Sequence, residues 1–436
     1  MKAMNPSAAS ASTPATLTTD RPPSGKRGTA QWSQPTSIHP RFISIRGLSS
    51  SDEEAWRDLA VRSVEPNPFY EVDFLVPACR YLRGGKSVVL LVAEEEGRFH
   101  GCLPVRRINR AGINCALLIT SWRHLYCFLG TPLVAPERGV EAMSCLLSAL
   151  RGTGPWRRIV VLELFGDDGP IAGYLRSAAG RLGITVRAHA PGERAVLCFQ
   201  EEDRRSLPAS VTKQRRDKAR QWRRLCRELG TPAIAERSLD GDATVNFLAL
   251  EAAGWKGKAG TALASRHGDA AFYRELTSRF GASGRLRLYS LEAAGQTLAM
   301  STNFRAGPGL FGWKTAYDER FARYAPGAQL QLRVRELVPD DGLRWFDSCA
   351  AVGDDHQLRL TPYRRRTATL VVGGGEWLEG PVLTLVVLVV KVSRNVRELS
   401  AKTLRRRLIA LPRDIRIAFS RSVRPRDVTD RRVPRD

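Results

Sequence analysis

Short apolar runs alternate with glycine-containing or charged turns along most of the chain, which is the pattern of a mixed sheet with helices on its faces. Residues 42–48 predict a first strand, and residues 51–64 predict a helix. Residues 1–40 are instead rich in Ser, Thr, Ala and Pro, with few large apolar side chains. Such a segment buries too little surface to offset chain entropy, so we expect residues 1–40 to be disordered.

An internal repeat organises the middle of the chain. Residues 74–101 align without a gap on residues 272–299, at an offset of 198 positions. Each copy predicts a helix end, an apolar strand, a Gly-containing turn and a second strand. A strand with Trp (Trp122, Trp313), a Gly/Pro segment, a helix and a further strand follow in both copies. The matched order indicates duplication and two similar α/β domains, each with a mixed sheet.

The segments outside the repeat are basic. Residues 204–227 predict a helix with one face dense in Arg and Lys. Residues 382–390 form an apolar run that we expect to be a strand, and an amphipathic basic tail follows it. The predicted organisation is a disordered segment 1–40, a supporting domain 41–200, a catalytic domain 201–372, and a strand plus tail 373–436.

The charge of the chain favours an anionic partner. Lys and Arg number 68 against 44 Asp and Glu, for a formal net charge of +24. Phosphate-bearing cosubstrates, nucleic acid and anionic membranes are all compatible with that charge. The eight cysteines show no CxxC spacing, so no metal site is expected, and their apolar surroundings suggest reduced thiols in a cytoplasmic protein. The N-terminus lacks the apolar core of a secretory signal.

The second half resembles the GNAT-type acyltransferases of the FemAB/CelD-like group, described as cellulose- or exopolysaccharide-biosynthesis acetyltransferases. The residues that carry the resemblance are Gly254-Trp255-Lys256-Gly257, Gly260-Thr261-Ala262, Gly312-Trp313-Lys314-Thr315-Ala316-Tyr317-Asp318-Glu319, Tyr324-Ala325-Pro326-Gly327, Phe346-Asp347 and Arg364-Arg365-Arg366. The first half resembles the group through Asn67-Pro68-Phe69 and Gly130-Thr131-Pro132-Leu133. The resemblance implies tandem GNAT-like domains and acyl-CoA as the donor. Related FemX-type enzymes transfer an amino acid from aminoacyl-tRNA instead.

A candidate phosphate site lies between a predicted strand and a predicted helix. It comprises Tyr324, Pro326, Gly327, Ala328 and Gln329. Free N–H groups at a helix start bind pyrophosphate, and glycine permits close approach. GNAT enzymes use a Gln/Arg-x-x-Gly-x-Gly/Ala loop here, of which this sequence keeps Gly327. The alternative is an ordinary Pro-Gly helix start.

Acyl transfer to an amine or hydroxyl needs a base and an acid. Asp347 or Asp318 is the predicted base, His356 is a further candidate, and Tyr317 precedes Asp318 at a strand end. Asp347 follows Phe346 in the strand where GNAT sheets splay to admit the acyl-pantetheine arm. The alternative for Asp347 is a structural hydrogen bond, because a buried carboxylate needs a partner.

The tripeptide GWK occurs twice, at residues 254–256 and 312–314. We expect Trp255 and Trp313 to pack in the second domain. Lys256 and Lys314 can reach a phosphate or a carboxylate of the substrate, or can simply be solvated. The prediction is that both GWK segments approach one substrate cleft from opposite sides.

The sequence therefore predicts an acyl-CoA-dependent N- or O-acyltransferase that acts on a sugar-derived or cell-envelope-related acceptor. The alternatives are an aminoacyl-tRNA-dependent transferase and a non-catalytic nucleic-acid-binding or scaffold protein. The basic tail suits peripheral contact with an anionic membrane. A helix docked on the sheet explains the tail equally well.

Overall fold

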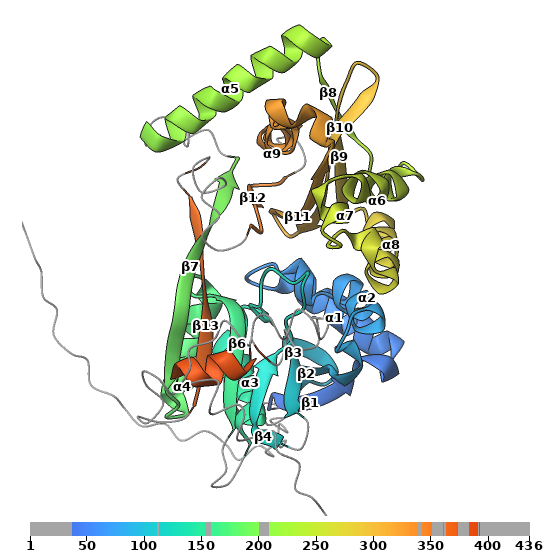
Figure 1. The fold of residues 1–436 in the computed structure, drawn as a ribbon. Coiled ribbons are helices and arrows are strands. Elements are labelled where there is room, and N and C mark those ends of the chain that lie inside the picture. Colours follow the sequence, from blue (N-terminus) through green and yellow to red (C-terminus); the bar gives the residue numbers. More distant parts are fainter. Residues whose placement is uncertain are drawn as a thin grey trace, which may run out of the picture. The chain divides into compact units, whose positions relative to one another are not determined.

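The strands of the computed structural model fall into two sets with the same order and the same pairing directions (Figure 1). The first set is β1 His39–Ser44, β2 Val89–Glu95, β3 Arg98–Arg110, β4 Ile113–Ser121 and β6 Ile159–Gly166. The second set is β8 Ala233–Glu236, β9 Leu286–Ala293, β10 Gln296–Ala306, β11 Gly309–Tyr317 and β12 Trp345–Asp347. In each set the first four strands pair antiparallel in succession, and the fourth pairs parallel with the fifth. The predicted mixed α/β fold is confirmed.

Two strands join the sets into one 13-stranded sheet. β13 Arg364–Val372 lies between β6 and β7 Val186–Cys198, and β7 pairs in turn with β12. The short β5 Leu133–Val134 pairs with β3. The structure describes residues 37–110, 113–152, 158–199, 209–337, 342–350, 361, 363–373, 383–390 and 392, which belong to one compact unit.

Equivalent positions of the repeat adopt equivalent structure. Glu96 and Gly97 have φ of 51° and 80°, and Ala294 and Gly295, at the same offset of 198, have φ of 48° and 71°. Two successive positive φ angles make the tight hairpin turn that matches strand twist. The aligned Phe74 and Phe272 also contact each other, with ring centroids 5.5 Å apart. The halves therefore pack on each other through equivalent residues of the repeat.

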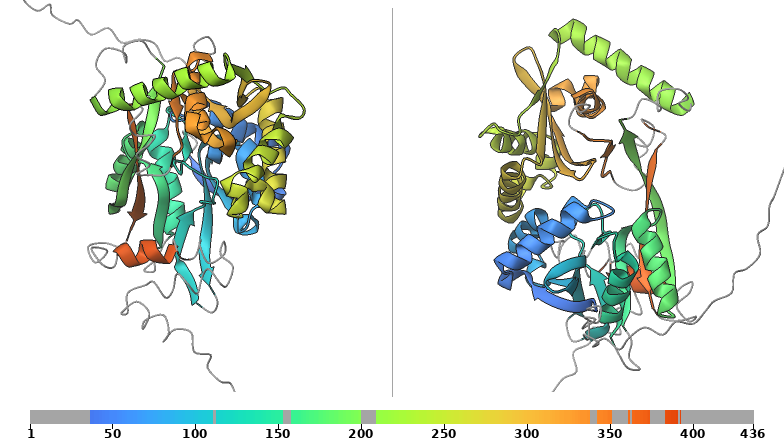
Figure 2. Two further views of the ribbon diagram at one scale, coloured as in Figure 1. Left: turned by 45° about the horizontal axis from the view of Figure 1, so that its top comes forward. Right: turned by 180° about the vertical axis from the view of Figure 1, so that it is seen from behind.

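Helices cover both faces of the sheet. Those of the first half are α1 Ser50–Arg62, α2 Val72–Tyr81, α3 Gly139–Arg151 and α4 Pro170–Arg181. Those of the second half are α5 Ala209–Leu229, α6 Ala243–Ala253, α7 Trp255–Lys258, α8 His267–Ala282 and α9 Pro326–Leu337. Short 3-10 turns are η1 Ile45–Gly47, η2 Pro68–Tyr70, η3 Gly85–Ser87, η5 Leu263–Ser265 and η6 Glu319–Tyr324. In the second half, α6 and α8 lie on one face, and α9 with α5 on the other (Figures 1 and 2).

Among the described residues, the two largest of three clusters of buried side chains lie between these layers. The larger cluster joins both halves and includes Phe74, Phe272, Phe304 and Trp313. The smaller one lies between α9, α5 and the second set of strands, and its members include Leu225, Leu298, Leu330 and Val334. Because α5 contributes Leu225 and the half-buried Trp222 to the smaller cluster, its opposite face is left to the arginines.

One secondary-structure prediction is wrong. Residues 383–390, expected as a strand, form a helix. Val387 and Val390 are three positions apart and pack on Leu118, Val161 and Val371 of the sheet. A helix satisfies its own backbone while it presents these valines to one apolar surface, whereas a strand needs a free sheet edge.

Other predictions fall partly outside the described residues. Residues 1–36 and 393–436 lie outside them, so the expected disorder and the basic tail have no structural description, and β1 begins at His39. Across the described ranges, no helix is both long and apolar enough to cross a bilayer. The same ranges contain no cluster of three or more His, Cys, Asp or Glu that could hold a metal ion.

Candidate functional site

β11 and β12 separate after a short parallel pairing. Their last paired residues are Phe311 and Asp347, and β11 continues to Tyr317 with no further pairing on that side among the described residues. Gly312 occupies the branch point, where an added Cβ would lie 2.7 Å from Cζ of Phe346. A cavity of about 500 Å³ lies at the separation. It is lined from the second half by both GWK segments, Thr315, Gln331 and residues 348–350, and from the first half by Leu125, Tyr126 and Phe128.

A β-bulge sets the direction of the second GWK segment. Thr302 pairs with Lys314 and Asn303 pairs with Gly312, so Trp313 is the extra residue. A bulge breaks the strict alternation of side chains along a strand. Trp313 is buried, stacks on Tyr273 at 5.5 Å between ring centroids, and donates its indole N–H to the carbonyl oxygen of Tyr126 at 3.2 Å. Its predicted core position is confirmed.

The two GWK lysines meet on one carboxylate. Lys256 Nζ and Lys314 Nζ lie 3.2 Å and 2.9 Å from the same oxygen, Oε1 of Glu251. The other carboxylate oxygen accepts the backbone N–H of Leu263 at 2.8 Å. Lys256 also donates to the carbonyl oxygen of Thr315 at 2.9 Å. The structure therefore brings the two GWK segments together at one cavity.

Burial and charge act together on this cluster. Burial lowers the pKa of Lys256, the neighbouring charge of Lys314 lowers it further, and Glu251 offsets part of the shift. Burial pulls the pKa of Glu251 upward, but the lysine charges and the Leu263 N–H outweigh burial and leave it below its usual range. Glu251 is therefore a carboxylate that fixes the two ammonium groups.

Trp255 corrects one expectation. Its side chain is 52% exposed at the start of α7, so it is not a core residue. The helix α6 ends at Ala253, and Gly254 turns the chain so that Trp255 stands at the rim of the cavity. Lys256 Nζ lies 5.9 Å from the centroid of its ring.

Asp347 is locked in a buried ion pair. Its side chain is fully buried, and Oδ2 contacts Arg194 at 2.6 Å and Arg365 at 3.1 Å. Its Oδ1 accepts the backbone N–H of Cys349 at 2.9 Å. Burial pulls the pKa of Asp347 upward, but the two arginine charges outweigh burial and hold it below its ordinary value. These contacts suit the structural alternative and do not suit a general base.

Among the other predicted proton-transfer residues, Asp318 and Tyr317 are not cavity-lining residues. Asp318 caps η6 by accepting the backbone N–H of Arg320, whose guanidinium also lies 2.6 Å away and lowers the pKa of this carboxyl. Tyr317 is half-buried at the end of β11, where its ring packs against the smaller core cluster. His356 lies outside the described residues.

The predicted phosphate loop forms the start of α9. Ala325, with φ of 52°, turns the chain, and Pro326 begins the helix. A Cβ on Gly327 would lie 3.2 Å from Cγ2 of Thr315, so the helix start is close to β11. Ala328 is half-buried beside it.

Two residues of that loop are engaged with α5. Tyr324 is buried and donates its hydroxyl to Glu228. Gln329 donates to the carbonyl oxygen of Lys218 at 2.8 Å and accepts from Arg333 at 2.8 Å. These side chains attach α5 to the loop, which leaves backbone groups around Gly327 as the ones available to a phosphate.

The sequence did not predict the role of Glu251, nor that residues of the first half would line the cavity. Glu251 is a buried acid within the apolar segment FLALEAA, three residues before a glycine, and such an acid signals a buried cation partner. Leu125, Tyr126 and Phe128 carry no comparable signal, because only the fold brings residues from the other half to the cavity.

Comparison with known proteins supports the fold. Residues 212–363 match the family model described as "Acetyltransferase (GNAT) domain". The crystal structure of FemX is similar, with a TM-score of 0.50 and 10% identity over 73% of this chain and 95% of that chain. A conserved protein of unknown function from Bacteroides thetaiotaomicron has a TM-score of 0.50 and 11% identity over 78% and 100% of the two chains. At these identities the two structures show the fold alone. A comparison with curated protein sequences found no match.

Proposed function

We propose that the chain is an acyl-CoA-dependent acyltransferase that acts at the cavity between β11 and β12. The observation that supports this most is the separation of these two strands. It lies within the residues that match the GNAT domain, and the sequence resemblance implies that an acyl-pantetheine arm enters a GNAT sheet there. The acceptor is an amine or hydroxyl of a sugar-derived or cell-envelope-related molecule, as the resemblance to the exopolysaccharide-biosynthesis group implies.

The proposed donor site runs from the start of α9 into this cavity. Pro326 has no N–H and only sets the direction of the first turn, so the proposed donors to the pyrophosphate are the backbone N–H groups of Gly327 and Ala328, which the positive end of the helix dipole assists. Thr315 lies beside Gly327 and also lines the cavity, so one strand connects the two sites. The acyl group then lies in the cavity that Gly312 and residues 348–350 line.

Proton transfer is proposed for His356 and Tyr317. Asp347 and Asp318 are both held in ion pairs that keep the pKa of each carboxyl low, which disfavours them as bases at neutral pH. Tyr317 ends β11 near the start of α9, with its Cδ1 3.8 Å from a Cβ placed on Gly327. We assign protonation of the leaving thiolate to the Tyr317 hydroxyl because of this place beside the proposed donor site at the start of α9.

Isothermal titration of the full chain with acetyl-CoA tests the donor site. We expect micromolar binding that falls at least tenfold in Gly327→Asp, since the new carboxylate repels phosphate. Gly327→Asn is the matched control, because it places a side chain of the same size beside Thr315 Cγ2, 3.2 Å from the new Cβ, without the negative charge. Equal affinity in both variants would mean that the pyrophosphate does not bind at α9.

One observation favours aminoacyl-tRNA as the donor instead. Exposed cations of α5 recur at intervals of three and four residues, which places them on one helix face. They are Lys213, Arg216, Arg220, Arg223 and Arg227. Under this alternative, tRNA binds with a steep salt dependence that becomes shallower in Arg216→Gln and Arg223→Gln, and acetyl-CoA does not bind.

A further inference from the structure

The lysine cluster holds more positive charge than its carboxylate neutralises. Two ammonium groups, on Lys256 and Lys314, share the single charge of Glu251. Throughout the described ranges, no second carboxylate contacts either ammonium group. Within the described part of the chain, one unit of positive charge is therefore uncompensated.

The surplus charge faces the cavity. The side chain of Glu251 is fully buried, whereas those of Lys256 and Lys314 are 22% and 12% exposed and line the cavity. The charged residues among the described cavity lining are these two lysines. A partly buried charge without a counterion is costly, and burial already lowers the pKa of Lys256. An anion in the cavity would remove that cost.

The ammonium groups also keep donors for such an anion. Each lysine has three N–H donors. Lys256 uses two, on Glu251 and on the Thr315 carbonyl, and Lys314 uses one on Glu251 while it lies 5.2 Å from the centroid of the Tyr126 ring. The exposed ring of Trp255 stands beside Lys256 and offers a flat apolar face.

We infer that Lys256 and Lys314 bind a carboxylate or phosphate group of the substrate, with Trp255 packing on the ring or chain that carries it. The inference rests on the proposed function, since it names the chemical class of what that cavity accepts. Two sources have this chemistry. The anion is either the far carboxylate of a dicarboxylic acyl group on coenzyme A, or an acidic group on the acceptor sugar.

Matched ligand pairs distinguish the two sources by isothermal titration of the full chain. Succinyl-CoA against butyryl-CoA exchanges a terminal carboxylate for a methyl group on the same acyl chain. Glucose 6-phosphate against glucose, each with coenzyme A present, tests the acceptor. The inference predicts that the anionic member of one pair binds about tenfold or more tightly than its neutral partner.

Three variants tie this preference to the cluster. Lys256→Met and Lys314→Met each leave Glu251 one lysine, and each should abolish the preference. Glu251→Gln retains an acceptor for the Leu263 N–H but removes the internal counterion, so it should strengthen anion binding. Lys258→Met is the control, because Lys258 is exposed, pairs with Glu319 at 2.7 Å and is not among the cavity-lining residues.

The outcomes separate this inference from the proposed function. If acetyl-CoA binds but neither anionic ligand is preferred, or if the preference survives in Lys256→Met and Lys314→Met, the inference is wrong and the proposed function stands. If an anion preference follows the lysines while no acyl-CoA binds, the anion site stands and the acyl-CoA donor is wrong. Weaker anion binding in folded Glu251→Gln would also overturn the inference.

Discussion

The two halves share one topology, but the space beyond the paired residues of their parallel strands is filled in the first half and open in the second. In the second half, β11 runs on from Phe311 to Tyr317 beyond its pairing with β12, and a cavity opens. In the first half, β4 ends at Ser121, one residue after its last pair with β6 at Thr120. The chain then turns back across the gap, and the N–H groups of Gly130 and Gly166 bond to Leu164 and Thr131.

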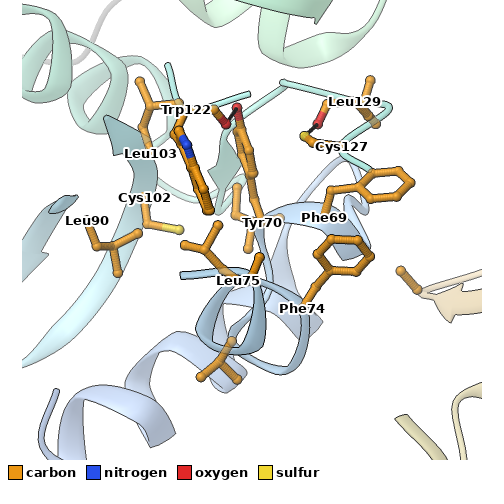
Figure 3. Packing of buried hydrophobic residues seen from close by; sticks show 14 of the residues in the cluster. Phe69, Tyr70, Phe74, Leu75, Leu90, Cys102, Leu103, Trp122, Cys127 and Leu129 are labelled. Carbon is orange, nitrogen blue, oxygen red and sulfur yellow. Dashed lines mark hydrogen bonds between the residues drawn. The ribbon is translucent and has the colours of Figure 1, made fainter. Parts of the chain in front are cut away.

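The returning segment fills the first-half gap with aromatic and apolar side chains. Figure 3 shows Trp122 packed against Tyr70, whose hydroxyl donates to the Trp122 carbonyl oxygen at 3.4 Å. Cys127 and Leu129 lie farther along the same segment and are buried. Three other residues of this segment, Leu125, Tyr126 and Phe128, line the cavity of the other half. The segment after β4 thus fills the space between the parallel strands of the first half. The same segment also forms one wall of the cavity in the second half.

The largest expected contrast is between tryptophans of the two halves. Trp122→Ala empties the filled gap and should lower the free energy of unfolding by about 3–5 kcal/mol. Trp255→Ala, at the exposed rim of the open cavity, should change it by less than about 0.5 kcal/mol. Urea denaturation measures both. Equal losses would contradict the distinction between a filled and an open gap.

Asp347→Asn breaks the ion pair that ties β12 to β7 and β13. Arg194 is buried and loses its counterion, so we expect a loss of about 3–5 kcal/mol. Since the folded pKa of Asp347 is lowered, its stabilisation is complete above the unfolded carboxyl pKa of about 3.9 and is lost as pH falls through the lowered value. Urea denaturation between neutral and acid pH should show a smaller acid-dependent loss in Asp347→Asn. The variant Asp318→Asn, at the half-buried cap of η6, should cost about 1 kcal/mol or less.

Gly130 beside the filled space of the first half and Gly312 beside the open cavity of the second half allow a matched pair of substitutions, with smaller expected effects on the free energy of unfolding. A Cβ at Gly130 would lie 1.9 Å from the backbone oxygen of Glu163, so Gly130→Ala must move backbone and should cost about 3 kcal/mol. A Cβ at Gly312 meets the movable ring of Phe346 first, so Gly312→Ala should cost about 1 kcal/mol. Acetyl-CoA titration should show the reverse order, with affinity lost in Gly312→Ala and kept in folded Gly130→Ala. If only Gly130→Ala lost affinity for acetyl-CoA, the donor would bind in the first half and not at the proposed cavity of the second half.

The sequence predicted the repeat, the strand order within each copy and the convergence of the GWK segments, because turn glycines and apolar runs are local signals. It did not predict that β13 would insert beside β6, since strand neighbours depend on the assembled sheet. The exposure of Trp255 was missed because tryptophan is usually buried. Trp255 is exposed because it follows the end of α6 directly after the turn at Gly254. Asp347 was recognised as a carboxylate in need of a partner, but Arg194 and Arg365 are distant in sequence and became visible only in the fold.

The smallest expected effect is a pH dependence of anion binding at the cavity of the second half. Because burial and Lys314 lower the pKa of Lys256, this ammonium loses its charge at a lower pH than an ordinary lysine. Binding of the preferred anionic ligand should be constant above about pH 7, where a carboxylate and a phosphate monoester (second pKa about 6) are both ionised, and should weaken as pH rises through the lowered pKa of Lys256. Lys256→Arg stays charged throughout, so its affinity should persist to higher pH. A wild-type profile that matches that of Lys256→Arg up to the pKa of an ordinary lysine, about 10.4, would show that Lys256 is not the charge that binds the anion.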